Sequence, residues 1–503
     1  MRPTPSLQNH DSASGPNFIN QFKTVLGTGV FNADGEMWKF HRNMTRPFFT
    51  KERISHFDIF DRHADEALRL LRERLHEGHP VDIQDLMGRF TLDSATEYLF
   101  GQNVDSLSAP LPYPPSSPLS CTPEALAAKS HPANRFSEEF VKAQVISLRR
   151  AYFSNAWPLW EFWRNKAAVH VRTVDEFIEP LCRAALQRKA QREMEQDVAP
   201  GLRVEDADDE TLLEHLVNLT DGTTPDEFAL SLDLQVIRDE TVNIMVAGRD
   251  STTITLTMAC YRLAQYPEVF HRLRQEVIET VGTGKPTYDD IRKMKYLRAV
   301  INEVLRLYPP VPFNLRYAKK DTVWPSMKPD GQPIFVPKGM PCLFSPYLMQ
   351  RRKDLWGPDA DRFDPDRFLD ERLDKYLTPN PFIFIPFNAG PRICLGKEFA
   401  YNEASFMLIR LLQQVHGMRL VQHVAPDAVP PPGWADSLGS DGSDEVIFKH
   451  HLTIYVQGGV WLEMDMEDPD EGLGADEPVL VSPTVEVAER MEAQTSDQGF
   501  QAL

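Results

Sequence analysis

The spacing of apolar residues along the chain predicts a mainly helical protein. Apolar side chains recur every three or four residues, as they do along the buried face of a helix. Helical segments are predicted over residues 38–101, 137–195, 211–219, 230–266, 268–281 and 288–307. The last segment ends at Tyr308-Pro309-Pro310, because proline cannot continue a helix.

A second pattern, with apolar residues at alternate positions, occurs in the C-terminal half. Residues 321–343 hold short runs of this kind, with turns at Pro329-Asp330-Gly331 and at Lys338-Gly339. Residues 446–456 predict a terminal hairpin. A further helix is expected from just after Cys394 to about Val415. The predicted fold class is therefore mainly α with small β-sheets.

Three segments carry neither pattern and are expected to lack regular structure. Residues 1–17 are polar, and residues 106–132 are rich in proline and serine. Residues 463–503 hold twelve acids and one base (Arg490), a balance of −11 within a total net charge of −19. We expect an acidic, disordered tail there. The negative total argues against a nucleic-acid partner.

The five cysteines are odd in number and widely spaced, and no two form a C-x-x-C pair. This argues against a disulfide scaffold or a zinc ribbon and fits a reducing compartment. No apolar stretch is long enough to predict a transmembrane helix. The first residues do not resemble a signal peptide.

One cysteine, Cys394, lies in a loop that glycines bracket, Phe387-Asn388-Ala389-Gly390-Pro391-Arg392-Ile393-Cys394-Leu395-Gly396, just before a predicted helix. Such a loop suits a thiolate that binds haem iron, because backbone N–H groups and a helix N-terminus lower a thiol's pKa. Glycine also lets the backbone approach a flat macrocycle, and Arg392 is placed to reach a propionate. The alternative is an inert buried thiol. However, F-x-x-G-x-R-x-C-x-G should arise by chance in on the order of one in ten thousand chains of this length.

With these residues the loop resembles that of the cytochrome P450 family. The resemblance implies the family's fold and a haem b whose iron has Cys394 as its axial ligand. The other matching positions in the loop and in the helix after it are Phe387, Gly390, Arg392, Gly396, Phe399, Ala400 and Glu403.

Glu303 and Arg306 are three residues apart on a predicted helix and can pair on one face. Alone, such a pair is usually a solvated surface ion pair. The family, however, places E-x-x-R upstream of F-x-P-x-R-F, which matches Phe363-Asp364-Pro365-Asp366-Arg367-Phe368. The resemblance therefore implies a buried, structural network of Glu303, Arg306 and Arg367 that supports the haem loop.

The long predicted helix contains Ala247-Gly248-Arg249-Asp250-Ser251-Thr252. An interior glycine beside a hydroxyl can open a helix to water. The resemblance implies that Ala247 lies against the haem and that Asp250 and Ser251 deliver protons. Ser251 stands where the family usually has threonine, so more leakage of reduced oxygen is expected. The alternative is a kink without chemistry.

The resemblance also implies that Trp38, Arg42 and Arg316 reach the haem propionates. It covers residues 31–464, so we expect a haem-thiolate monooxygenase domain over 31–462, after a disordered or partial segment 1–30 and before the tail 463–503. The family usually has its W-x-x-x-R helix much later in the chain. A membrane anchor, a first helix and two strands are therefore expected to be missing.

Several segments look most like the fungal branch that hydroxylates long-chain alkanes and fatty acids, so an apolar substrate is expected: a long-chain alkane, a fatty acid or a xenobiotic. No nucleotide-binding motif is present, so electrons must come from another protein. The resemblance implies an NADPH-dependent flavoprotein reductase at the endoplasmic reticulum membrane. A peripheral or cytoplasmic location stays open. The expected docking face is the basic group Lys39, Arg42, Arg46, Lys51, Arg53 and Lys397.

The aromatic segment Tyr152 to Trp163, flanked by cations, fits either a membrane interface or ordinary helix packing, which we favour slightly. Three functions remain at this point: a reductase-dependent monooxygenase, a truncated haem protein that binds ligands without turnover, and a helical scaffold without haem. The ordered motifs make the scaffold the weakest of the three.

Overall fold

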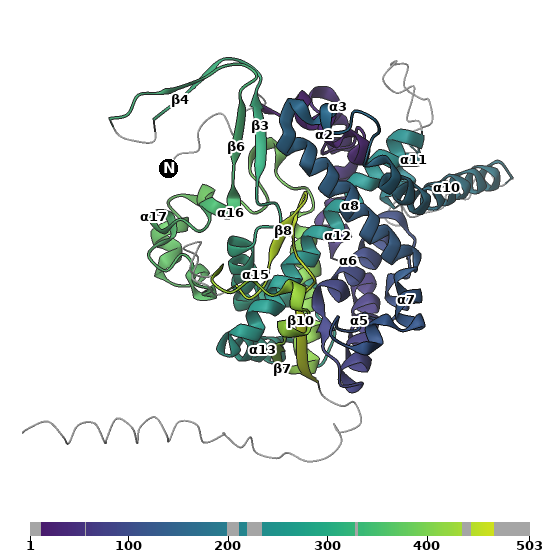
Figure 1. Cartoon of the computed structure of the whole chain (residues 1–503), viewed down its shortest axis with the longest axis vertical. Helices are drawn as coiled ribbons and strands as arrows, with labels where there is room; N and C mark the ends of the chain where they lie inside the picture. Colours follow the sequence, from purple (N-terminus) through teal and green to yellow (C-terminus); the bar gives the residue numbers. More distant parts are fainter. Residues whose placement is uncertain are drawn as a thin grey trace, which may run out of the picture. The chain divides into compact units, whose positions relative to one another are not determined.

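The computed structural model describes residues 12–55, 57–198, 211–218, 234–326, 330–434 and 444–466, which are mainly helical (Figure 1). The α-helices are α2 (Pro16–Leu26), α3 (Gly35–Thr45), α4 (Lys51–Ile54), α5 (Asp58–His76), α6 (Ile83–Phe100), α7 (Pro123–Lys129), α8 (Pro132–Phe153), α9 (Trp157–Trp160), α10 (Ala168–Val198), α11 (Leu212–Asn218), α12 (Leu234–Gln265), α13 (Pro267–Val281), α14 (Tyr288–Lys293), α15 (Lys295–Leu307), α16 (Pro346–Met349), α17 (Lys353–Trp356) and α18 (Lys397–Gln414).

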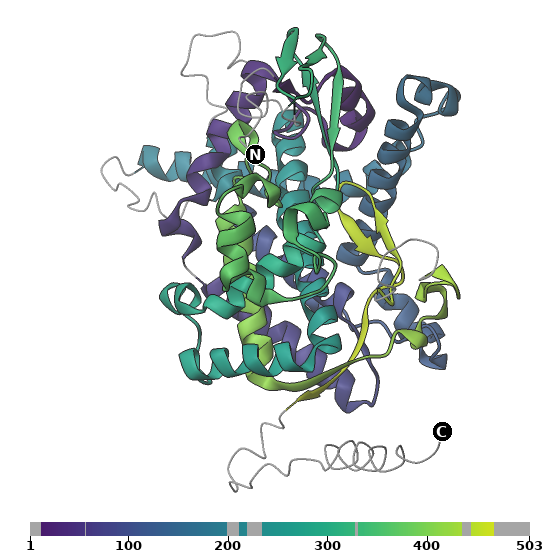
Figure 2. The same cartoon turned by 90° about the vertical axis from the view of Figure 1, so that its left-hand side faces the viewer.

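The small sheets are antiparallel, as the alternating patterns predicted. One has the order β1 (Ser12–Ala13), β3 (Asn314–Ala318), β6 (Pro341–Phe344), and another has the order β2 (Val81–Asp82), β10 (Trp461–Met466), β7 (Val415–Leu420). Two hairpins join β4 (Thr322–Trp324) to β5 (Ile334–Val336) and β8 (Phe448–His450) to β9 (Ile454–Val456). The sheet with β3 and β6 and the strands β7 and β10 lie at opposite ends of the helices (Figures 1 and 2).

The central helix α12 passes through two hydrophobic clusters. Its N-terminal half, up to Val246, packs with α2, α8, α10 and α11. Its C-terminal half, from Ile254, packs with α5, α13, α15 and α18. Residues 247–253, which carry the polar motif, belong to neither cluster. The helix therefore has a polar stretch in the middle of the molecule, where a bound group would find polar side chains.

Three predictions of irregular structure were wrong in part. Within residues 1–17, Ser12 and Ala13 pair with Ala318 and Tyr317, and α2 begins at Pro16. Strand pairing uses backbone groups, which the polar side chains did not reveal. The loop predicted over residues 106–132 contains α7. The tail prediction began too early, because β10 continues to Met466; residues 467–503 and 1–11 lie outside the described residues, as does Pro329 of the predicted turn.

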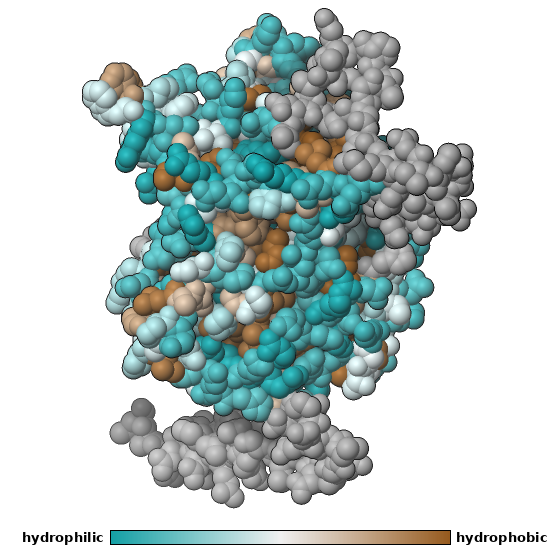
Figure 3. All heavy atoms as spheres, turned by 90° about the vertical axis from the view of Figure 1, so that its right-hand side faces the viewer, coloured by the Kyte–Doolittle hydropathy of each residue, from teal (hydrophilic) through white to brown (hydrophobic). Residues whose placement is uncertain are grey.

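The helical prediction over residues 137–195 is confirmed for α8 and α10 but not between them. There the aromatic segment exposes three large apolar side chains: Leu159 is 78%, Phe162 70% and Trp163 90% exposed. The packing interpretation is therefore wrong at these three positions, whereas Trp157 and Trp160 are half-buried. A buried ion pair between Arg150 and Glu161 (2.7 Å) holds the segment against α8. Elsewhere, apolar side chains reach the surface in separate patches (Figure 3).

Candidate functional site

The loop before α18 is closed by its own backbone. Cys394 N donates to Phe387 O (3.0 Å), and Ile393 N donates to Gly390 O (3.0 Å). Asn388 has a φ of 60° and Gly390 a φ of 76°. Asparagine tolerates this left-handed region and glycine adopts it freely, which explains both residues. The loop therefore holds Cys394 in a fixed position at the start of the helix.

Cys394 lies on the loop just before α18. Its side chain is open to solvent, although dense protein around it raises the pKa of the thiol through desolvation. The Gly396 N–H, Arg42 and Lys397 act in the opposite direction and lower this pKa. The thiol is thus accessible to a bound group and surrounded by groups that favour its charged form.

Three arginines from three parts of the chain meet beside the cysteine loop. Arg392 pairs with Asp34 (2.6 Å) and donates to Ala33 O (3.1 Å). Arg42 donates to Ile393 O (3.0 Å). Burial, followed by repulsion from Arg392, lowers the pKa of Arg316 to about 10. Within the described parts of the chain, Asp34 is the one carboxylate in contact with this group, so positive charge is in excess.

Trp38 of α3 lies between two of these arginines. Its ring is 5.7 Å from the Arg42 guanidinium carbon and 4.6 Å from that of Arg392, distances at which a cation and an indole attract each other. The structure thus brings together Trp38, Arg42, Arg316 and Arg392, four residues singled out from the sequence. Asp34 was missed, because its role depends on a long-range contact and no motif marks it.

On α12, Ala247 and Ser251 share a half-buried strip of a helix that is otherwise mostly buried. The Ser251 hydroxyl donates back to Ala247 O (2.7 Å). The helix runs from Leu234 to Gln265 without a break, so an opening at Gly248 stays a prediction. These two residues present a small, polar surface.

Asp250 points away from this strip, toward α8. Its carboxylate accepts from Gln144 (3.2 Å) and pairs with Arg249 (3.0 Å). It lines a pocket of about 760 Å³ between α6, α8 and the turn after β8, where His451 also lies. The structure therefore does not bring the Asp250 carboxylate and the Ser251 hydroxyl together. Gln144 and His451 were missed from the sequence because their contacts are long-range.

Glu303, Arg306 and Arg367 form a fully buried network. Glu303 and Arg306 make two hydrogen bonds of 2.7 Å, and both are 0% exposed. Arg367 Nε lies 3.5 Å from Glu303 Oε1. The other N–H groups of Arg306 donate to the carbonyls of Gln350, Ala360 and Arg362, which satisfies all of its donors.

Gln350 connects this network to the cysteine loop. Its amide donates to Leu305 O and Arg306 O (both 3.0 Å), and its oxygen accepts from Ile385 N (2.9 Å), which leads into the loop. Sequence reasoning missed this glutamine. The segment 362–366 contributes from the other side, where Asp364 N donates to Glu303 Oε1 (2.9 Å).

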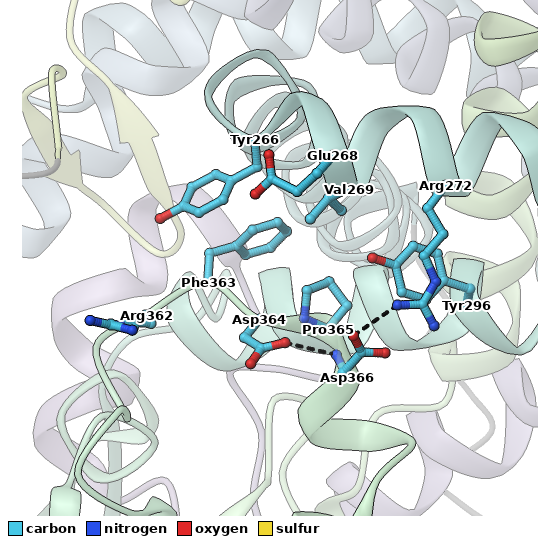
Figure 4. Close-up of a pocket in the computed structure, with 10 residues that line it drawn as sticks. All are labelled: Tyr266, Glu268, Val269, Arg272, Tyr296, Arg362, Phe363, Asp364, Pro365 and Asp366. Atoms are coloured by element: carbon cyan, nitrogen blue, oxygen red, sulfur yellow. Dashed lines mark hydrogen bonds and ion pairs between the residues drawn. The ribbon is translucent and has the colours of Figure 1, made fainter. Parts of the chain in front are cut away.

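The outer face of the same segment lines an open pocket of about 530 Å³ (Figure 4). Tyr266 and Phe363 pack together at one side, and Arg272 pairs with Asp366 (2.8 Å) at the other. The segment therefore separates a solvated surface from the buried network.

Comparison with known proteins agrees with this geometry. The family model described as cytochrome P450 matches residues 7–416. Cytochrome P450 52-E3 of Starmerella bombicola is 35% identical over 80% of the chain and 71% of its own length. Cytochrome P450 monooxygenase pvhE of Talaromyces variabilis is 33% identical over 87% of the chain and 76% of its own. Cytochrome P450 52A13 of Debaryomyces hansenii is 34% identical over 92% of the chain and 80% of its own length. The chain belongs to the cytochrome P450 family.

Proposed function

We propose that Cys394 supplies the axial thiolate of haem b in a monooxygenase that hydroxylates an apolar organic substrate. Members of the family use haem b with a cysteine thiolate. One observation carries the assignment to this site: an accessible thiol lies beside three arginines, and among the described residues only Arg392 of the three pairs with a carboxylate, Asp34. The residues present therefore fit a flat, dianionic group. When bound, the haem supplies the activation of dioxygen.

Each residue near the thiol has a proposed task. Arg42, Arg316 and Arg392 bind the two propionates, whose charges relieve the repulsion between the guanidiniums. Trp38 holds Arg42 and Arg392 in place. The Gly396 N–H stabilises the charged sulfur. Ala247 and Ser251, on the half-buried strip of α12, would leave room for dioxygen.

Protons reach the site through Asp250. Its carboxylate lines the 760 Å³ pocket, which supplies water. A side-chain rotation that releases Gln144 and Arg249 carries the carboxyl toward Ser251, whose hydroxyl passes the proton on. Asp250→Asn should slow turnover by about 100-fold or more, because the amide cannot carry a proton.

The substrate class follows from similarity. Several relatives carry the cytochrome P450 52 designation, as does the one from Starmerella bombicola, and the resemblance points to a long-chain alkane or fatty acid. The test is turnover of dodecane and lauric acid with NADPH, a fungal flavoprotein reductase and isotopically heavy dioxygen. A hydroxylated product with one heavy oxygen atom is expected. A haem-loaded protein that consumes no substrate would favour the alternative, a haem protein without turnover.

An acidic flavoprotein reductase is the proposed electron donor. The proposed docking cations lie on α3, on the short helix η1 (Arg46–Phe49), on α4 and at the start of α18: Lys39, Arg42, Arg46, Lys51, Arg53 and Lys397. Lys39 and Lys397 are 49% and 42% exposed. Reversing both charges to Glu should slow reductase-driven turnover at low salt. Lys293→Glu on α14, whose lysine is 67% exposed, is the matched control. Equal rates in both variants would rule out this docking face.

The exposed aromatic segment is the proposed membrane contact. Phe162 and Trp163 are exposed beside Arg164, and Lys166 lies 3.8 Å from the Trp160 ring. Aromatic rings next to cations favour the lipid–water interface. Within the described residues no helix combines the length and apolarity that a membrane span requires. Phe162→Ser with Trp163→Ser should weaken sedimentation with vesicles of phosphatidylcholine that contain anionic phosphatidylserine. Leu348→Ser, at a residue 61% exposed on α16, should not.

A further inference from the structure

A buried carboxyl group that the proposed function does not use lies on α18. Glu403 is 0% exposed, and neither of its oxygens has a hydrogen-bond partner among the described residues. The hydroxyl of Thr252, on the neighbouring helix α12, is also buried without a partner. Thr252 is the polar group that acts on Glu403, although the two side chains do not have the geometry of a hydrogen bond.

The charged side chains on the helices around Glu403 are engaged elsewhere. They form the following contacts: Asp61 and Asp65 of α5 with Arg410, Asp250 of α12 with Arg249, Glu303 with Arg306 on α15, Asp290 with Lys293 on α14, Glu276 of α13 with the backbone of Tyr296 and Leu297, and Arg274 of α13 with Val415 O. No described cation is thus available to neutralise a charge on Glu403.

A charged carboxylate without a partner is very unstable in such surroundings. Burial raises the pKa of Glu403 well above its usual range, and only the Thr252 hydroxyl acts to lower it. A neutral carboxylic acid, by contrast, carries an O–H donor that suits an unpartnered hydroxyl. A direct hydrogen bond after a small adjustment, or one bridging water, would satisfy both groups.

We propose that Glu403 is a neutral carboxylic acid whose O–H donates a hydrogen bond to the Thr252 hydroxyl oxygen, directly or through one water, and so positions α12 against α18. The inference rests on the proposed function. Thr252 follows Ser251 in the chain, and α18 begins just after the Cys394 loop. The link therefore sets the position of the Ser251 hydroxyl relative to the thiolate. Glu403 is a positioning residue and does not touch the reacting atoms.

Infrared spectroscopy of the haem-loaded protein tests the protonation directly. At neutral pH the wild type should show the C=O stretch of a protonated, buried carboxylic acid that disappears in Glu403→Gln. Other buried acids contribute to this region, since burial raises the pKa of Asp82 to about 7. The difference between wild type and variant isolates Glu403. Glu398→Gln, at an exposed residue of the same helix, is the control and should leave the band unchanged. A band that survives Glu403→Gln would overturn the proposal.

The positioning role has a separate readout, the fraction of NADPH electrons recovered in product. Glu403→Gln should retain this fraction, because the amide still donates a hydrogen bond. Glu403→Leu and Thr252→Val should lower it severalfold and release more hydrogen peroxide. If Glu403→Leu does not fold, Thr252→Val alone decides. Unchanged coupling in Thr252→Val would contradict the role. Failure of the proposed function is distinguishable, because it would remove the haem spectrum from the wild type.

Discussion

Two groups of arginines in this molecule differ in how their charges are balanced. Around Glu303 every N–H of Arg306 has an acceptor, and Arg367 donates to Asp359 and Trp356 as well as lying close to Glu303. Beside Cys394, Asp34 pairs with Arg392, and the one hydrogen bond that Arg316 makes among the described residues is to the carbonyl of its neighbour Leu315. In the first group the chain itself satisfies every donor except Arg367 Nε, which lies beside the Glu303 carboxylate, whereas the second group has positive charge left over.

This difference suggests that the arginines around Glu303 stabilise the fold and that those beside Cys394 bind a ligand. A satisfied network contributes to the fold and leaves nothing to offer a ligand. Excess positive charge is unfavourable in the protein alone, and it persists where an outside anion compensates it. We therefore expect different losses from substitutions in the two groups. Substitutions around Glu303 should lower the stability of the protein, and substitutions beside Cys394 should lower its affinity for haem.

The largest effect is expected from Glu303→Ala. Removal of the one carboxylate leaves Arg306 buried with an unpaired charge, which should lower the free energy of unfolding by roughly 3–5 kcal/mol. Urea denaturation of the haem-loaded protein measures it. Glu268→Ala, at an exposed residue on α13, is the control. A loss below about 1 kcal/mol would place this network among ordinary surface ion pairs.

A second effect concerns His451, which lines the pocket at Asp250. Burial lowers the pKa of His451 to about 4. The unfolded chain, with a histidine pKa of about 6.5, takes up a proton first on acidification. The contribution of His451 to the free energy of unfolding is therefore fully present above pH ~6.5. It falls by about 3 kcal/mol as the pH drops toward 4.

Unfolding measured against pH should show this acid limb flattened in His451→Gln. The limb should persist in His423→Gln, since that histidine is exposed. Identical slopes in wild type and His451→Gln would mean that this histidine is protonated in the folded protein.

Arg316→Gln separates the two groups of arginines most clearly. Loss of a charge-assisted contact to a propionate, worth about 1.5–3 kcal/mol, should speed haem release by about 10- to 100-fold. The stability of the haem-free chain should not fall, because repulsion between Arg316 and Arg392 is relieved. Haem transfer to an acceptor protein measures the rate of haem release, and urea denaturation measures the stability of the haem-free chain. Lys319→Gln is the surface control. A destabilised haem-free chain with unchanged haem release would reverse the account.

The smallest effect is expected from Ser251→Thr. The added methyl group restricts the side-chain rotamer and should raise product formed per NADPH by no more than about twofold. Haem content and substrate affinity should stay the same. Lower coupling in this variant would indicate that the half-buried strip on α12 is shaped for serine.

Local patterns in the sequence predicted much of this molecule. Amphipathic spacing placed the helices, and the motifs at Cys394, Glu303 and Trp38 identified residues that the structure brings together. These succeeded because the chemistry sits within a few residues of sequence. No local pattern could reveal the roles that depend on contacts between distant segments. These are the roles of Asp34, of Gln350 and of Glu403 beside Thr252. The same reason explains why strand β1 was missed, and why the exposure of Trp163 was not foreseen: burial depends on the whole fold.

The central claim, that Cys394 binds haem iron as a thiolate, has one direct test. The carbon monoxide difference spectrum of the reduced wild-type protein should show the red-shifted band of a thiolate-bound haem. Cys394→Ala should lose this band. Cys342→Ala and Cys121→Ala, at two other accessible cysteines, should keep it. A folded wild type without the band, or a Cys394→Ala protein that retains it, would contradict the account.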